Sequence, residues 1–157
     1  MKCFKLIKIL LFVSIFYLSS NCGYQPLFNK DSQSFSISSY NLEGNKRISS
    51  LLKNNLVTIK KDENLLILNI NSKKKTAVAD KTLTGKVINY TLTLDFEISA
   101  SNTNNNIIFS KVYTKTRNYA SSDLYSDTLN NEKKLIESLT EAVANELQND
   151  LNSIFTK

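Results

Sequence analysis

The sequence predicts an α+β two-layer sandwich: a four-stranded, mainly antiparallel sheet with two helices on one face, in the order β-α-β-β-β-α. A long alternation of apolar and polar residues at 86–99 indicates a strand, and apolar residues recurring every four positions at 131–155 indicate a helix. The 157 residues are 41% hydrophobic and 22% charged, which suits one folded domain and argues against intrinsic disorder. We expect a signal peptide at residues 1–21 and a single domain at 22–157.

The first part of the predicted domain contains a strand, a helix and a second strand. Residues 34–40 alternate apolar side chains with serine, which indicates a strand with one buried face. Asn45 is the expected N-cap of a helix whose apolar residues recur at helical spacing. A second strand is expected at 65–70, followed by a polar stretch at 71–75. Residues 76–84 are compatible with either an extension of this strand or a loop.

A long hairpin follows, and it contains the clearest strand pattern in the chain. Within residues 86–99, the even-numbered side chains from 88 to 98 are apolar, and the odd-numbered ones from 89 to 97 are Asn, Thr, Asp and Glu. This alternation predicts a sheet with one packed face and one polar face. Residues 100–106 are turn formers, and residues 107–117 are the expected return strand. Its register stays open, because either its even-numbered or its odd-numbered side chains satisfy the pattern.

The last predicted element is an amphipathic helix at 131–155. Its apolar stripe is expected to pack on the sheet, and its opposite side carries Lys, Glu, Asn and Gln. A membrane-surface helix is the alternative, but the polar side is of mixed charge and not rich in lysine. Residues 118–130, which are rich in turn formers, would connect the hairpin to this helix.

The N-terminal residues have the pattern of an export signal. Residues 1–8 are basic, and residues 9–18 form a short apolar run. About 20 apolar residues are needed to span a bilayer, so ten fit the apolar region of a signal peptide. Cys22 follows a few residues later, as in bacterial lipoproteins, where the thiol receives diacylglycerol and the new amino terminus is acylated. The alternative is an ordinary secreted protein with an unmodified cysteine.

The residue inventory offers little for catalysis. The chain has no His and no Trp, and its two cysteines, Cys3 and Cys22, both lie near the N-terminus. Histidine is the commonest general base near neutral pH and a frequent metal ligand. Asp95 and Glu97 are two carboxylates on one strand face, but such pairs are usually solvated. We therefore expect no enzyme activity, no cofactor and no metal site, and we expect binding instead.

Lys73, Lys74 and Lys75 form the densest basic run and are the candidate contacts for an acidic ligand. Lysines attract the phosphate or carboxylate groups of an acidic glycolipid as point charges. The alternative is a solvated loop tip. The net charge of +6 does not indicate nucleic-acid binding, since three lysines belong to the expected signal peptide and no aromatic-rich binding motif accompanies the charge.

The segment CGYQPLF at residues 22–28 resembles the start of mature proteins of the LptE family, the lipopolysaccharide-assembly lipoproteins. The order of the later elements is also similar, including Arg117-Asn118-Tyr119 at the end of a strand and a long C-terminal helix. The resemblance implies an outer-membrane lipoprotein, anchored through Cys22 on the periplasmic side. It also implies that the protein plugs an LptD-like β-barrel translocon, assists barrel assembly and takes part in lipopolysaccharide transport. An auxiliary lipoprotein subunit of a lipid-transport ABC system is the alternative.

Overall fold

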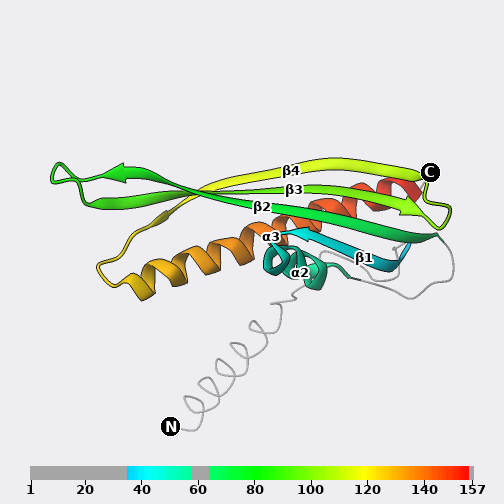
Figure 1. Cartoon of the computed structure of the whole chain (residues 1–157), viewed down its shortest axis with the longest axis horizontal. Helices are drawn as coiled ribbons and strands as arrows, with labels where there is room; N and C mark the ends of the chain where they lie inside the picture. Colours follow the sequence, from blue (N-terminus) through cyan, green and yellow to red (C-terminus); the bar gives the residue numbers. More distant parts are fainter. Residues whose placement is uncertain (1–34, 58–63, 156–157) are drawn as a thin grey trace, which may run out of the picture.

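The computed structural model describes residues 35–57 and 64–155. The predicted signal peptide, Cys22 and the CGYQPLF segment lie outside the described residues. Figure 1 shows a sheet of long strands packed on two helices. In chain order the elements are β1 (Ser36–Gly44), α2 (Lys46–Asn55), β2 (Leu65–Lys81), β3 (Val87–Asn102), β4 (Ile107–Ala120) and α3 (Tyr125–Phe155).

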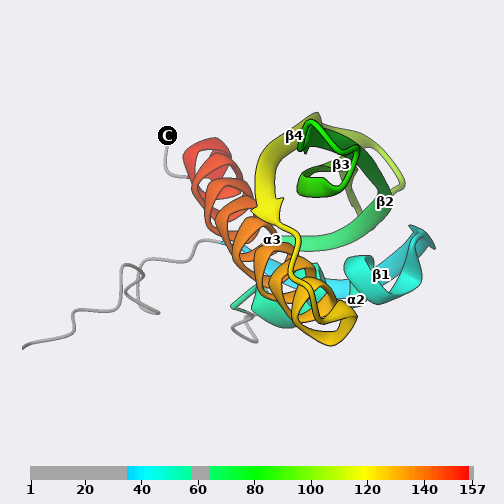
Figure 2. The same ribbon diagram turned by 90° about the vertical axis from the view of Figure 1, so that its left-hand side faces the viewer.

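The strands lie in the sheet in their chain order, β1-β2-β3-β4. β1 pairs with β2 in parallel, because α2 carries the chain back to the end where β1 began, and the other two pairs are antiparallel. Both helices lie on one side of the sheet, as Figure 2 shows from the end of the molecule. The predicted α+β class and the element order are therefore confirmed.

The core lies between the helices and one face of the sheet. The even-numbered side chains of β3 from Leu92 to Ala100 are buried, and Phe96 is fully enclosed. The predicted stripe of α3 meets them. It consists of Leu139, Val143, Leu147 and Leu151, all buried at four-residue steps. The same alternation puts the polar side chains of β3 on the opposite face, because successive side chains of a strand point to opposite sides.

The β3–β4 register answers the question that the sequence left open. Phe96 pairs with Tyr113, and Ala100 pairs with Phe109. The odd-numbered side chains of β4 therefore point toward the helices, and Tyr113 is buried in the core. The core needs large side chains beside Phe96, and only the odd-numbered positions of β4 supply two aromatic rings there.

β2 is much longer than the strand expected at residues 65–70. Pairing with β3 continues through the lysine run to Lys81, which pairs with Val87. The sequence left residues 76–84 open between strand and loop. In the structure, β2 includes these residues as far as Lys81. The lysines lie inside the strand and not at its end, which corrects the loop-tip expectation. Lysine favours strands weakly, but here the neighbouring strand supplies regular backbone partners.

Two other boundaries also differ from expectation. β1 continues to Gly44 instead of ending at residue 40. α3 begins at Tyr125, six residues before the expected start. The hydroxyl of Thr128 accepts a hydrogen bond from the Ser122 backbone N–H at 2.8 Å, so turn-forming residues here organise the start of a helix. Asp127 also lies in the first turn, where a negative charge is favourable.

The corner between β1 and α2 is held by a compact set of buried hydrogen bonds. The Ser72 hydroxyl donates to the Asn45 carbonyl at 2.9 Å and lies 2.7 Å from the Ser49 hydroxyl. The Asn45 side chain caps α2 by accepting from the Ile48 N–H, as predicted. Gly44 has a φ of +68°, and a Cβ built there would lie 2.2 Å from the Ser72 carbonyl oxygen. Only glycine fits this corner without displacing backbone.

Candidate interaction surface

The face of the sheet that points away from α2 and α3 is polar and has no described helix over it. We call it the open face. Its side chains join neighbouring strands by hydrogen bonds, which is typical of a regular polar ladder. The bonded pairs across the strands are Asn41 with Asn69, Asn69 with Ser99, Thr91 with Asn118, Thr93 with Thr116, and Asp95 with Thr114.

The two carboxylates of β3 lie on this open face and belong to the ladder. Glu97 accepts hydrogen bonds from Lys73 at 2.6 Å and from Asn71 at 3.0 Å. The hydrogen bond from Lys73, together with its charge, lowers the pKa of Glu97. Asp95 accepts from Thr114 at 2.7 Å. Both carboxylates are thus engaged by neighbours, and Glu97 remains ionised near neutral pH.

The three candidate lysines do not share one face. Lys73 and Lys75 are on the open face, where Lys73 Nζ lies 2.6 Å from Glu97 and Lys75 Nζ lies 3.9 Å from Asp95. Lys74 points to the helix side and lies 2.9 Å from Glu132 of α3. The structure therefore separates the basic run into two parts, and each lysine has an acidic neighbour. Such exposed pairs contribute little to stability.

A shallow hollow of about 250 Å³ lies on the open face, toward the end of the sheet where β2 and β4 begin. Glu97, Ser99, Lys111 and Val112 contribute to its lining. Val112 is 60% exposed and is a rare large apolar side chain among the polar ones of this face. The open face therefore offers hydrogen-bonding groups, paired charges and few exposed apolar side chains, which suits a polar protein surface better than an apolar ligand.

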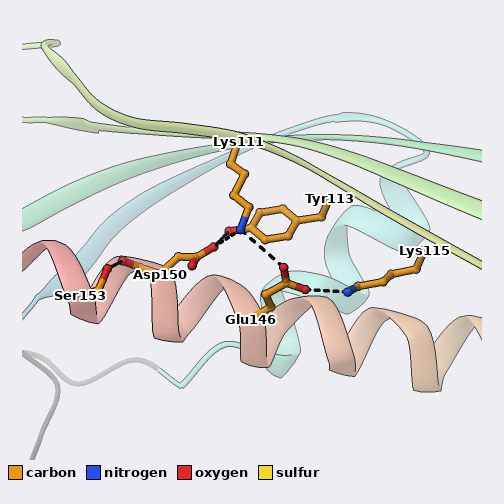
Figure 3. A network of polar contacts seen from close by, with 6 residues as sticks. All are labelled: Lys111, Tyr113, Lys115, Glu146, Asp150 and Ser153. Atoms are coloured by element: carbon orange, nitrogen blue, oxygen red, sulfur yellow. Dashed lines mark hydrogen bonds and ion pairs between the residues drawn. The ribbon is translucent and has the colours of Figure 1, made fainter.

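On the helix side of the sheet, a group of charged side chains fastens α3 to β4 (Figure 3). We call it the α3–β4 clamp. The Tyr113 hydroxyl donates to Asp150 at 2.6 Å, and Lys111 donates to the same carboxylate oxygen at 2.7 Å. Glu146 accepts from Lys115 at 2.6 Å and from Lys111 at 3.5 Å. The sequence periodicity predicts that α3 packs on the sheet, but not which polar groups align it.

The clamp shifts the pKa of its carboxylates. Hydrogen bonding by Lys115 lowers the pKa of Glu146, and Lys111 adds to the effect against an opposing contribution from burial. Burial opposes the charge of Asp150 most strongly, but the hydrogen bonds from Lys111 and Tyr113 outweigh it, so the pKa of Asp150 is also lowered. Burial and the adjacent Asp150 raise the pKa of Tyr113, which stays a neutral donor.

We expect the clamp to make folding stability depend on acid pH. Carboxylates with lowered pKa values bind fewer protons in the folded state, so their contribution is present above about pH 4–5 and is lost as the pH falls. In urea unfolding, the double variant Glu146→Gln/Asp150→Asn should be about 1 kcal/mol less stable at pH 7, since its pairs are partly exposed. At pH 3 the difference should be smaller, because protonation of the carboxylates weakens the ion pairs. An equal difference at both pH values would contradict the role of these charges.

Two further depressions lie on the helix side. One of about 500 Å³ lies between α2 and α3 and includes Ile48, Leu51 and Ile136. Another of about 530 Å³ lies between the long hairpin and the start of α3, beside the stacked rings of Tyr90 and Tyr119. The sequence pattern assigns Tyr90 and Ile88 to the core row of β3, but Tyr90 lines this second depression beside the start of α3, and Ile88 is 41% exposed.

No group of three or more His, Cys, Asp or Glu side chains in residues 35–57 and 64–155 is arranged to hold a metal ion. Across the same residues, no helix is long and apolar enough to cross a membrane. Two acidic residues with defined partners were not predicted from the sequence. Glu132 accepts a hydrogen bond from Lys74, and Asp150 accepts hydrogen bonds from Lys111 and Tyr113. Both lie on the polar side of a helical pattern, and nothing in that pattern separates them from solvated acids.

The sequence matches no protein-family model and no curated protein. The fold, however, is similar to solved structures of bacterial lipoproteins. Rare lipoprotein B from Shewanella oneidensis matches with a TM-score of 0.55 and 14% identity, over 73% of this chain and 94% of that protein. A predicted lipoprotein of Caulobacter crescentus matches with a TM-score of 0.59 and 15% identity, over 78% and 91%. A minor lipoprotein of Acinetobacter baumannii matches with a TM-score of 0.54 and 16% identity, over 76% and 92%.

The chain therefore has the fold found in a group of bacterial lipoproteins. At 14–16% identity, the likeness establishes the arrangement of strands and helices and not a shared activity. The layout that the LptE resemblance implied, with a first strand, a helix, a long hairpin and a C-terminal helix, is present in the structure.

Proposed function

We propose that this protein is an outer-membrane lipoprotein, acylated at Cys22, that plugs an LptD-like β-barrel and assists its assembly. In this role it takes part in the transport of lipopolysaccharide to the outer leaflet, and it needs no catalytic group of its own. The observation that carries the proposal is the combination of the CGYQPLF segment at residues 22–28 with the lipoprotein fold.

The open face supports the proposal physically. A plug in a polar lumen must present a rigid surface whose hydrogen-bonding groups are satisfied both before and after docking. The ladder from Asn41 to Asn118 meets this need, because its side chains are already joined across the strands. The clamp keeps α3 fixed behind the sheet, so the open face keeps one shape.

The proposal is tested by purifying the acylated protein in mild detergent from outer membranes. A much larger β-barrel should accompany it in equal amount. Recovery of the protein alone would refute the plug role, and recovery with an inner-membrane transporter would favour the ABC-system alternative.

Variants at two exposed apolar positions show whether the open face makes the contact. Val112→Glu places a charge on that face and should reduce barrel recovery at least about tenfold, because an unpaired charge is costly to bury. Leu124→Glu is the matched control, since Leu124 is equally exposed near the start of α3. Equal loss in both variants would exclude the open face as the contact.

We propose that Lys73 and Lys75 contact the phosphates of lipopolysaccharide. Lys74, which points to the helix side of the sheet, does not contact these phosphates. The ion pairs of Lys73 and Lys75 are exposed, with 54% of the Lys73 side chain accessible, so a phosphate can displace the carboxylate at small cost. Lys73→Ser/Lys75→Ser should weaken lipopolysaccharide binding several-fold at 0.15 M salt, and Lys74→Ser should leave it nearly unchanged. The measurement is titration with labelled lipopolysaccharide. Unchanged binding in the double variant, or the triple variant, would remove these residues from the ligand site.

A further inference from the structure

One end of the sandwich, which we call the proximal end, gathers the starts or ends of five elements. β1, β2 and β4 begin there, and β3 and α3 end there, as Figure 1 shows. Ser36 pairs with Leu65, and the rings of Phe35 and Phe155 lie 5.9 Å apart. The opposite, distal end carries the β2–β3 turn. The proximal end comprises residues 35–41, 65–69, 99–110 and 151–155, where the sheet is cut at the level at which Asn41 pairs with Asn69, Asn69 with Ser99, and Ser99 with Ser110.

The four segments of the proximal end contain no Asp, Glu, Lys or Arg. At the usual frequency of charged residues in proteins, about a quarter, segments of this combined length would carry roughly seven charges. The charged residues 60–63 precede Asn64 in the sequence and lie outside the described residues. The polar side chains of the described part of this end are therefore all uncharged, and most of them are Asn and Ser.

Apolar side chains are exposed at the same end. Ile107 is 68% exposed, and Ile108 and Ile154 are 37% and 36% exposed. The distal end also exposes apolar side chains, with Leu83 fully exposed, but charged residues surround it there. These are Asp80, Lys81, Lys86 and Asp123, and Lys86 forms an ion pair with Asp123. Uncharged polar groups with apolar side chains suit the bilayer interface, and charges near its apolar layer are costly.

The length of chain between Cys22 and the described domain indicates which of the two ends can lie at the membrane. The thirteen residue steps from Cys22 to Phe35 span at most about 45 Å. β2 runs from the proximal to the distal end over 17 residues, which is about 50–55 Å. If the distal end rested on the membrane with the strands upright, Phe35 would lie beyond the reach of an anchor at Cys22. The proximal end has no such restriction.

We infer that, before the protein enters a barrel, the proximal end rests on the phospholipid bilayer that holds the lipid anchor, with Ile107, Ile108 and Ile154 facing the lipid. This inference rests on the acylation of Cys22 in the proposed function and goes beyond it, because it fixes the orientation of the sandwich relative to the membrane. The long hairpin then points away from the bilayer and presents the lysines of β2 well above it.

The test uses the acylated mature protein in vesicles of phosphatidylethanolamine and phosphatidylglycerol, without any barrel. Because the thiol of Cys22 carries lipid, a cysteine introduced by Ile107→Cys is the single reactive thiol and takes an NBD fluorophore. Leu83→Cys is the matched control at the distal end, and Ile154→Cys is a second proximal site. Lipids with a nitroxide in the upper acyl chain should quench the proximal labels at least three-fold more than the distal label.

Every result of this quenching experiment either supports or overturns the inferred orientation. Strong quenching and a blue-shifted emission at both proximal sites, with neither at Leu83→Cys, support the inference. Equal quenching at all three sites, or quenching only at Leu83→Cys, overturns it while acylation stands. The mass of each labelled chain is measured in the same samples. An unacylated Cys22 would overturn the anchor and this orientation together.

Discussion

Gly44→Ala should destabilise the protein by about 3 kcal/mol, enough to remove a large part of the stability of a domain of this size. A left-handed backbone conformation costs a non-glycine residue about 1–2 kcal/mol, and forcing an extra carbon into a packed region adds about 1–3 kcal/mol. Both apply here, because φ is +68° and the new Cβ would lie 2.2 Å from the Ser72 carbonyl oxygen. The measurement is urea unfolding followed by circular dichroism.

Gly85 provides the control for this experiment. Its φ is +84°, but a Cβ added there meets no atom within 4 Å. Gly85→Ala should therefore cost only the conformational part, about 1 kcal/mol. The excess at Gly44 measures the close approach between β1 and β2 at the corner that positions α2. Equal losses in the two variants would show that the corner relaxes freely.

Removing the lipid attachment should move the protein from the membrane to the soluble fraction. The experiment exports residues 22–157 with Cys22→Ser behind an ordinary cleavable signal peptide, because an unprocessed leader would itself hold the chain in a membrane. Each buried methylene of an acyl chain contributes about 0.8 kcal/mol, so loss of several chains should lower the membrane-bound fraction at least 100-fold. Among the described helices, none is long and apolar enough to span a bilayer.

The fold of the Cys22→Ser variant is measured in the same experiment. Far-UV circular dichroism should be unchanged, because Cys22 precedes the described strands and helices in the sequence. A folded variant that still fractionates with membranes after a high-salt wash would show that acylation is not what holds the protein there.

The parts of the fold predicted from sequence are those where one pattern extends over many residues. The alternation on β3 and the four-residue spacing of Leu139, Val143 and Leu147 each describe a buried face directly. The extension of β2 through Lys73 was not predictable in the same way. Its strand conformation depends on the pairing of Lys73 with Asp95, a residue that is distant in the sequence.

The candidate site was predicted in part for a similar reason. The polar composition of the open face follows from the alternation on β3, but the partners of its side chains follow from the register between strands. Lys73, Lys74 and Lys75 are consecutive in the sequence. Because successive side chains of a strand point to opposite faces, Lys74 lies on the helix side, and Lys73 and Lys75 lie on the open face. The carboxylates of Glu132 and Asp150 are brought to the sheet by the angle of α3, which no local pattern records.

The measurement that tests the central proposal most directly is the intact mass of the mature protein isolated from its own membrane. We expect a chain that begins at Cys22 and carries the added mass of a diacylglycerol thioether and an amide-linked acyl chain. A chain that retains residues 1–21, or one whose Cys22 bears a free thiol, would contradict the proposal of a lipid-anchored plug.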